Sequence, residues 1–217
     1  MKLYGFWRSL ATYRVRVAMA LKGVKADEVS IDLLKGKQHS EDYLAVNPQG
    51  VVPALILDQP GPPLFQSLAI LEYLEETHPQ PALLPRDARG RARVRGLALI
   101  AAADGHPLVV PRVRSYLEKE LKVDESRRNL WLAHWTMRAL DAIEEHLSKE
   151  RETGRYCHGD QVTLADVCMV SQVIGALAYF SCDTKGVPTV MRVYGECMEI
   201  EAFSRAHPLK QSSFSRS

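Results

Sequence analysis

Ser9 is the first residue whose type and position could do chemistry. It lies between a short apolar and aromatic segment, residues 2–6, and a segment with helical periodicity, residues 12–22. A hydroxyl at that place can donate to a sulfur held near the helix N-terminus, where hydrogen bonding and the helix dipole both lower the pKa of a thiol. Ser9 is therefore a candidate activator of a ligand thiol. A lone serine in a loop is more often a helix N-cap, and Thr12 competes for that capping role.

Pro53 is the second candidate, because it precedes an apolar run, residues 54–57, that is typical of a buried strand. A proline here lets the Val52–Pro53 bond be cis at low cost, and the bend exposes a backbone N–H and C=O beside it. A peptide-like ligand can pair with such groups as a short added strand. Most bonds before proline are trans, so Pro53 taken alone indicates only the start of a strand.

Gln66 and Ser67 stand at the start of another helical segment, residues 67–77, which spaces leucines along one face. Free backbone N–H groups and the Ser67 hydroxyl at this helix N-terminus would suit a ligand carboxylate. The alternative is that Ser67 only caps its helix. Both roles are compatible in different ligand states.

The segments that carry these residues follow the order βαβαββα. Strands are expected at residues 2–6, 28–33, 54–57 and 64–65, and helices at residues 12–22, 41–46 and 67–77. A dense proline and glycine turn signal separates the last two strands, so they should form a hairpin. This order, with Val-Pro before the third strand, is that of a thioredoxin-like α+β domain, which we place at residues 1–80.

The rest of the chain shows no convincing strand. Beyond a Pro-rich stretch, long segments such as residues 89–103 and 130–149 have helical patterning. Thr163 and Asp166 have the spacing of a capping box at the start of a further helix. We therefore expect an all-α domain at residues 88–217.

Composition and charge exclude several classes of protein. The 217 residues are 46% hydrophobic and 25% charged, with a formal net charge of +2, so no nucleic-acid partner is indicated. No run approaches eighteen uninterrupted apolar residues, and the N-terminus lacks a signal-peptide core, so we expect a cytoplasmic protein with no membrane partner. The cysteines show no metal-ligand spacing and are interpreted as reduced and structural, with no metal site expected. They are Cys157, Cys168, Cys182 and Cys197.

Six blocks spread along the chain carry a family resemblance. They are Arg8 to Ala18, Asn47-Pro48 through Val52-Pro53, Gln66-Ser67-Leu68-Ala69-Ile70, Thr163-Leu164-Ala165-Asp166, Glu201-Ala202-Phe203 and His207-Pro208. The first resembles the signature Ser-Ser-Cys-x-Trp/His-Arg-Val-Arg-Ile-Ala of the zeta class of glutathione transferases, which holds the maleylacetoacetate and maleylpyruvate isomerases. The likeness covers nearly the whole chain, and the opening Phe6-Trp7-Arg8-Ser9 looks most like the bacterial maleylpyruvate isomerases.

The resemblance implies a glutathione transferase fold, glutathione as the cofactor, and a two-fold homodimer. The helical domain, residues 88–217, would then bind the electrophile. By position, the family's glutathione contacts carry over to Ser9, His39, Val52 beside Pro53, Gln66, Ser67 and, reaching across the dimer, His106. A solvated or internally satisfied histidine is the alternative for both His39 and His106.

The isomerases' substrate is a diacid, and its two carboxylates need cations while a thiolate adds beside the cis double bond and leaves again. The resemblance makes Arg8 and Arg112 the candidate substrate-binding residues, with Arg114 as an alternative to Arg112. Solvated surface arginine is the alternative for all three. A further pocket arginine of the maleylpyruvate isomerases is replaced here by Gly175–Ala178, so one carboxylate anchor is missing.

Leu10 and Ala11 stand where the zeta signature has its second Ser and its Cys. The identity of the electrophile is therefore left open. The first hypothesis is cis–trans isomerisation of a small unsaturated oxo-diacid such as maleylpyruvate or maleylacetoacetate, with glutathione thiolate as the nucleophile. The second is a transferase that consumes glutathione by conjugation or dehalogenation. The third is a non-catalytic ligand-binding protein of the same fold, against which the intact set of Ser9, Pro53 and Gln66-Ser67 argues.

Overall fold

The computed structural model describes residues 1–211, which form two compact units. The first comprises Met1–Ala82 with the described residues from Glu201 onward, and the second is Leu83–Ile200. The first unit contains β1 (Lys2–Gly5), α1 (Leu10–Leu21), β2 (Asp27–Ser30), the 3-10 helix η1 (Lys37–His39), α2 (Glu41–Val46), β3 (Ala54–Ile56), β4 (Leu64–Phe65) and α3 (Ser67–Thr77). The predicted order βαβαββα is confirmed.

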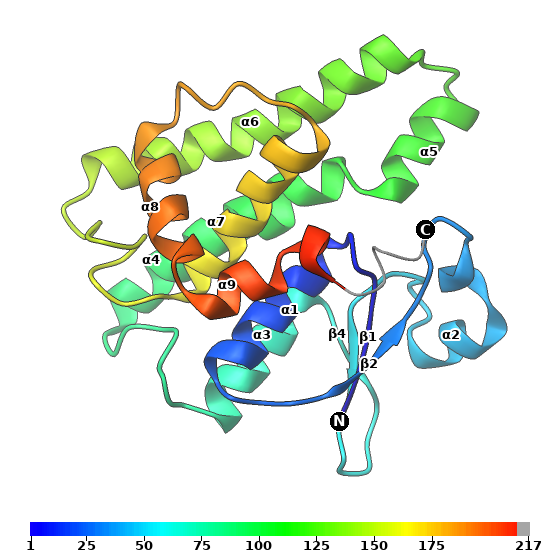
Figure 1. The fold of residues 1–217 in the computed structure, drawn as a ribbon, viewed down its shortest axis with the longest axis horizontal. Coiled ribbons are helices and arrows are strands. Elements are labelled where there is room, and N and C mark those ends of the chain that lie inside the picture. Colours follow the sequence, from blue (N-terminus) through cyan, green and yellow to red (C-terminus); the bar gives the residue numbers. More distant parts are fainter. Residues whose placement is uncertain (212–217) are drawn as a thin grey trace. The chain divides into compact units, whose positions relative to one another are not determined.

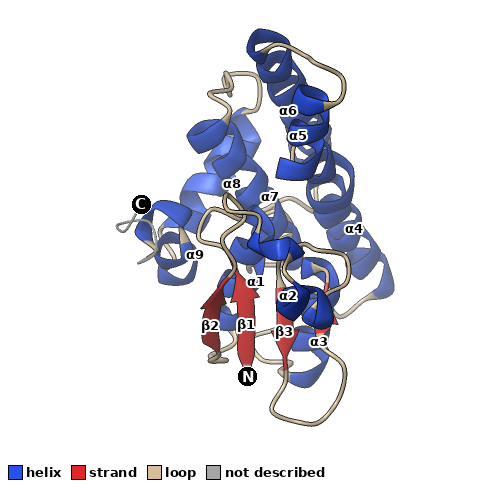
Figure 2. Cartoon of the chain, turned by 90° about the vertical axis from the view of Figure 1, so that its right-hand side faces the viewer, coloured by secondary structure: helices blue, strands red, loops and turns tan. Residues whose placement is uncertain are grey.

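The strands of the first unit form one mixed sheet in the order β2-β1-β3-β4. β1 is parallel to β2 and antiparallel to β3 (Figure 2). β3 is in turn antiparallel to β4. The register pairs Tyr4 with Ala54, and Ala54 with Phe65. The C-terminal ends of β1 and β4 therefore meet the beginning of β3 at one end of the sheet.

Side chains of β1 alternate between the two faces of this sheet. Tyr4 contacts Tyr43 of α2 with ring centroids 5.9 Å apart, on the face where Phe6 and Val52 also lie in one buried cluster. Leu3, which is buried, points to the opposite face, where α1 and α3 pack side by side (Figure 1). The sheet is therefore covered on both faces, and its end is the part left for a ligand.

A buried ion pair ties the C-terminal ends of α1 and α3. Lys22 Nζ donates to Glu75 Oε2 at 2.7 Å, to the His78 carbonyl oxygen at 2.7 Å and to the Pro81 carbonyl oxygen at 3.0 Å. The Lys22 side chain is 0% exposed and that of Glu75 is 9% exposed. All three ammonium protons thus have acceptors, which is what makes a buried lysine tolerable.

The end of the described chain packs with the first unit, through α9 (Glu201–Ala206) and the 3-10 helix η5 (Pro208–Lys210). α9 packs against α1, and the Tyr13 hydroxyl donates to the Phe203 carbonyl oxygen at 3.3 Å. The sequence-based boundary placed this segment in the helical domain. It groups with the first unit because the fully buried Phe203 joins that unit's core.

The second unit is helical. It contains α4 (Ala88–Leu99), the π-helical segment η2 (Ile100–Gly105), the 3-10 helix η3 (His106–Leu108), α5 (Pro111–Lys119), α6 (Glu125–Lys149), α7 (Leu164–Ile174), the π-helical segment η4 (Gly175–Tyr179) and α8 (Pro188–Met198). Every residue of α7 is buried, because this helix packs against α4, α6, α8 and η2. A helix that is apolar all round has to lie in a core, so α7 is the centre of the unit.

The start of α7 is fixed by the predicted capping box, which the structure confirms. The Asp166 carboxylate accepts from the Thr163 backbone N–H at 2.7 Å, from the Thr163 hydroxyl at 2.8 Å and from the Cys157 backbone N–H at 2.8 Å. Asp166 is fully buried, and burial raises its pKa while these donors oppose the rise. The box therefore also attaches the loop before α7 to the helix.

The helical segment predicted at residues 89–103 is confirmed, but α4 ends at Leu99 and the helix continues with π geometry in η2, a change that the sequence did not predict. Gly105 ends η2 at a point of close approach. A Cβ added there would lie 2.5 Å from Ala139 Cβ and 3.0 Å from Gln172 Nε2. Only glycine lets η2 come this near to α6 and α7.

None of the helices within residues 1–211 combines the length and apolar character needed to cross a bilayer.

Candidate functional site

Ser9 is the N-cap of α1. Its Oγ accepts from the Thr12 backbone N–H at 3.1 Å, and its carbonyl oxygen accepts from the Tyr13 N–H at 2.9 Å. The capping interpretation is therefore observed. Because the hydroxyl acts as an acceptor in this bond, its own proton can still be donated to a ligand. Capping and thiol activation by the half-buried Ser9 are compatible.

Thr12, the competing hydroxyl, faces the interior. It is 0% exposed, and its Oγ1 accepts from the Phe6 backbone N–H at 3.4 Å. A Cβ on Gly5 would lie 2.5 Å from Thr12 Cγ2, so the threonine methyl fills the space beside β1. Thr12 is thus committed to the packing of β1 against α1, which leaves Ser9 as the hydroxyl at the helix N-terminus.

The Val52–Pro53 peptide bond is cis, as the position before the third strand indicated. Val52 is 8% exposed, and β3 begins two residues later at Ala54. The Val51 carbonyl oxygen accepts from the Tyr43 hydroxyl at 2.6 Å and from Asn47 Nδ2 at 2.7 Å. The backbone ahead of β3 is therefore held from the α2 side.

Gln66 and Ser67 form the turn into α3. Gln66 is its N-cap, with φ 65° and ψ 120°, a left-handed φ that non-glycine residues rarely adopt and that marks stored strain. Its side chain makes no capping hydrogen bond; Nε2 donates instead to Gln49 Oε1 at 2.7 Å. Ser67 is the first helical residue and is 6% exposed. The N-terminal amides of α3 are thus left without a side-chain cap from Gln66.

The sheet topology brings these three segments together. Ser9 follows the C-terminal end of β1, Val52–Pro53 precedes the start of β3, and Gln66–Ser67 follows the end of β4. Because β3 is antiparallel to both β1 and β4, these three points share one end of the sheet. The site predicted from separate motifs is therefore assembled on one structural unit.

His39 ends η1 and is exposed. A Cβ on Gly50, whose φ is 64°, would lie 3.3 Å from His39 Nδ1. The imidazole therefore lies directly against the loop that leads to Val52. The structure brings His39 to the predicted site, and its contact with glutathione stays a prediction.

The cysteines lie in environments that do not favour a thiolate. All four are free, and Cys157, Cys168 and Cys197 are buried. Burial raises the pKa of the Cys157, Cys182 and Cys197 thiols above the ordinary value. These cysteines are therefore poor candidates for a nucleophile.

The remaining predicted residues are distributed over both units. Arg8 is half-buried in the loop between β1 and α1 of the first unit. In the second unit, His106 is the half-buried first residue of η3, and Arg112 is exposed in the first turn of α5. Arg114, two residues further along α5, is half-buried. Their roles in binding stay predictions.

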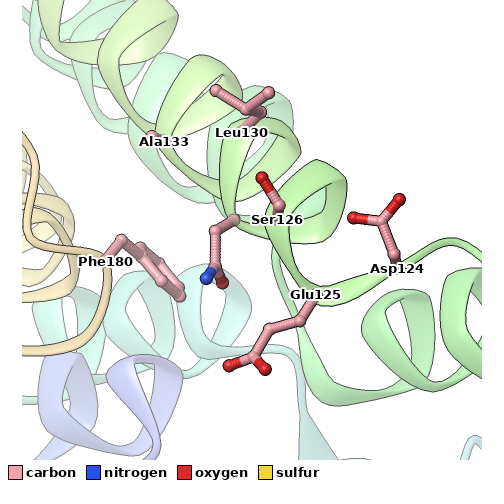
Figure 3. Close-up of a pocket in the computed structure, with 7 residues that line it drawn as sticks. Asp124, Glu125, Ser126, Leu130, Ala133 and Phe180 are labelled. Carbon is pink, nitrogen blue, oxygen red and sulfur yellow. The ribbon is translucent and has the colours of Figure 1, made fainter.

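The second unit also has an open cleft of about 780 Å³ (Figure 3). It is lined by Asp124, Glu125, Ser126, Asn129, Leu130, Ala133 and Phe180. Figure 3 shows Phe180 on the opposite side of the cleft from the α6 residues. The sequence analysis did not anticipate this cleft, because its walls come from the start of α6 and from the residue after η4, which no motif connects.

Comparison with known proteins agrees with this architecture. Residues 1–76 match the family described as Glutathione S-transferase, N-terminal domain. The chain is 44% identical to a maleylpyruvate isomerase of a Ralstonia species, over 97% of this chain and 98% of that protein. A maleylacetoacetate isomerase structure from Methylobacterium extorquens AM1, with bound malonate and GSH, is 48% identical with a TM-score of 0.95, covering 98% of this chain and 99% of that one. A holo maleylpyruvate isomerase, described as a bacterial glutathione S-transferase of the zeta class, is 43% identical with a TM-score of 0.93, covering 98% and 99%.

The chain belongs to the zeta class of the glutathione transferases. Leu10 and Ala11, the two residues that differ from the zeta-class signature, lie at the start of α1. Leu10 is 5% exposed and lies in the core, whereas Ala11 is half-buried. The replacement of serine by Leu10 therefore adds to hydrophobic packing, and Ala11 is the more exposed of the two departures.

The segment that the resemblance predicts to lack a carboxylate-binding arginine, residues 175–178, lies in η4. Gly175 and Ala176 are buried there, while Leu177 and Ala178 are exposed. No residue of η4 is charged. This zeta-class chain thus has an apolar surface at the position of one expected carboxylate anchor.

Proposed function

We propose that this chain is a glutathione-dependent cis–trans isomerase of a small unsaturated oxo-diacid such as maleylpyruvate or maleylacetoacetate. The observation that carries the proposal is the convergence of Ser9, Val52–Pro53 and Ser67 at one end of the sheet. The names of the relatives support it, because proteins 38–44% identical over nearly the whole chain are called maleylpyruvate or maleylacetoacetate isomerases.

The residues at the sheet end fit glutathione. The backbone of Val52 lies ahead of the β3 ladder and can pair with the ligand's peptide groups as an added strand. The uncapped amides of α3 and the Ser67 hydroxyl suit the γ-glutamyl carboxylate. Ser9, at the positive end of α1, can donate its hydroxyl proton to the sulfur.

Glutathione, when bound, supplies a thiolate that adds reversibly beside the cis double bond and so permits rotation. Ser9 lowers the pKa of the bound thiol by donating a hydrogen bond to its anionic form. Arg8 and Arg112 would neutralise the substrate's carboxylates, since a guanidinium offers paired N–H donors in the geometry of a carboxylate. His39 would contact glutathione next to Gly50, and His106 would do so from the neighbouring subunit of a homodimer.

A second candidate function, conjugation or dehalogenation with consumption of glutathione, is favoured by the uncharged η4 segment and by Leu10 and Ala11. The two functions differ in the fate of the thiol. The purified protein should be mixed with glutathione and maleylpyruvate while fumarylpyruvate formation and free thiol are both followed. Isomerisation yields product at constant thiol, whereas transfer consumes thiol in proportion to product. If neither fumarylpyruvate nor free thiol changes, the proposal fails and the result favours a non-catalytic ligand-binding protein.

Two further properties belong to this proposal. A homodimer is inferred from the family, in which the two-fold assembly places a glutathione site near the interface. A cytoplasmic location stays a prediction from the N-terminal sequence. Neither affects the chemistry assigned to Ser9.

A further inference from the structure

We propose that Tyr43 and Asn47 are positioning residues that hold the Val51 carbonyl and thereby aim the Val52 N–H at the bound tripeptide. The inference rests on the proposed binding of glutathione at Val52. Neither residue was a predicted contact; Asn47 entered the sequence analysis only as part of the Asn47-Pro48 motif.

The peptide group between Val51 and Val52 links the two side chains to the ligand. The Val51 carbonyl and the Val52 N–H belong to the same planar unit and, across a trans bond, point in opposite directions. The Val51 oxygen is held by the Tyr43 hydroxyl at 2.6 Å and by Asn47 Nδ2 at 2.7 Å. Two donors on one oxygen fix the plane of that peptide, so they also fix the direction of the N–H on its other side.

Both donors, the Tyr43 hydroxyl and the Asn47 amide, are held in place by their surroundings. Asn47 is the C-cap of α2 and is 1% exposed, and its Oδ1 accepts from the Gln49 backbone N–H at 3.2 Å. Tyr43 is 2% exposed and packs in the cluster that contains Phe6 and Val52. Side chains with no rotamer freedom lose no further entropy when the ligand binds, which is the condition for a preorganised site.

The protonation state of the Tyr43 phenol also bears on this hydrogen bond. Desolvation by burial raises the pKa of Tyr43 to about 12, against an opposing hydrogen bond from Asn47. The hydroxyl therefore remains a neutral donor across the pH range in which glutathione chemistry is measured.

The loop between α2 and β3 is also held from the α3 side, because Gln66 Nε2 donates to Gln49 Oε1 at 2.7 Å.

The test is Tyr43→Phe, which removes one oxygen and keeps the packed ring. We expect glutathione to bind about three- to tenfold more weakly by calorimetry, which is the effect of one net hydrogen bond. The KM for glutathione should rise by a similar factor, while kcat at saturating glutathione and the pKa of the bound thiol stay at wild-type values. A purely structural role would lower the melting temperature without this split.

Tyr4→Phe is the matched control, because Tyr4 packs against Tyr43 in the same cluster and has no recorded hydrogen bond through its hydroxyl within residues 1–211. It should leave the glutathione Kd unchanged. Asn47→Asp is the second variant, since a carboxylate keeps an acceptor for the Gln49 N–H and loses the donor to Val51. It should weaken binding in the same direction as Tyr43→Phe.

A truncated ligand tests whether the effect acts through the Val52 N–H. γ-Glutamylcysteamine lacks the cysteinyl carbonyl that an aimed Val52 N–H would meet, so wild type and Tyr43→Phe should bind it equally weakly. Equal affinities of wild type and Tyr43→Phe for glutathione itself would overturn the inference while leaving the proposed function intact. Absence of glutathione binding by the wild-type protein would overturn both.

Discussion

Ser9 caps α1, and we propose that it also activates a bound thiol; the two roles make different demands on its side chain. As N-cap it needs only an acceptor for the Thr12 N–H, whereas as thiol activator it needs a proton to donate. We predict that Ser9→Ala raises the pKa of bound glutathione and lowers turnover by roughly ten- to a thousandfold, as for one lost activating donor. Thiolate absorbance against pH and steady-state kinetics measure the two effects.

The same variant should unfold about 1 kcal/mol more easily, because the cap of α1 is lost. Ser9→Asp separates the roles, since a carboxylate caps a helix but has no proton to donate at neutral pH. Its stability should approach that of wild type while its activity stays low. An unchanged thiol pKa in Ser9→Ala would move activation to a backbone N–H, since the Thr12 side chain is 0% exposed and does not reach a ligand.

At the residue scale, sequence could place Ser9, Pro53 and Ser67 correctly at a helix start or before a strand, because helix starts and strand starts have local sequence signals. It could not find Tyr43, because an inward-facing tyrosine on a short helix gives the same pattern whether its hydroxyl is bonded or not. The acceptor, the Val51 carbonyl, is a backbone atom with no sequence signal at all. Positioning groups of this kind require coordinates.

At the element scale, the ion pair between α1 and α3 is an internal constraint of the first unit. Lys22→Met would remove the ammonium group that donates to Glu75 Oε2 and to the His78 and Pro81 carbonyl oxygens. We predict a loss of roughly 3 to 5 kcal/mol in the free energy of unfolding, measured by urea denaturation. Lys22→Met combined with Glu75→Leu should cost less than the single change, because the double variant does not keep the Glu75 carboxylate buried without the ammonium of Lys22.

An exposed ion pair supplies the control for this prediction. Arg155 and Glu196 form one at 2.7 Å with side chains 58% and 37% exposed. Arg155→Met should cost far less than Lys22→Met, because solvent screens an exposed pair. Equal losses in the two single variants would show that burial of the Lys22 pair has no special weight.

Gly105 tests the close packing of the second unit. Gly105→Ala places a methyl group 2.5 Å from Ala139 Cβ, and we predict a destabilisation of about 1 to 3 kcal/mol by overpacking. Gly96→Ala in α4 meets no atom within 4 Å and should stabilise the protein slightly, since alanine favours helix. Thermal unfolding of both variants measures the contrast, and a stable Gly105→Ala would mean that η2 can move away from α6.

Element order was predictable because the first unit alternates short apolar runs with helical periods, and most changes of period are marked by glycine or proline. The π-helical segments η2 and η4 were not predictable. Their cause lies in packing against α6 and α7, which a local pattern of apolar residues does not encode. The grouping of α9 with the first unit is likewise a tertiary contact, made by Tyr13 and Phe203 across most of the chain length.

At the scale of the whole molecule, the remaining prediction is a symmetric dimer with His106 acting in the partner's site. Light scattering at micromolar concentration should give about twice the 24.3 kDa chain mass. A mass near that of one chain would remove the cross-subunit role of His106 and leave the fold unaffected.

Subunit mixing tests that role directly. Ser9→Ala and His106→Ala protomers are each expected to be impaired, and a heterodimer of the two has one site with both lesions and one with neither if His106 acts across the interface. After random reassociation, about one site in four would then be wild type, so activity should recover well above either parent. If His106 serves its own chain's site, every site in the mixture keeps one lesion and no recovery follows. Mixing Ser9→Ala with wild type in the same way is the control for losses during reassociation, because its activity should fall only by dilution.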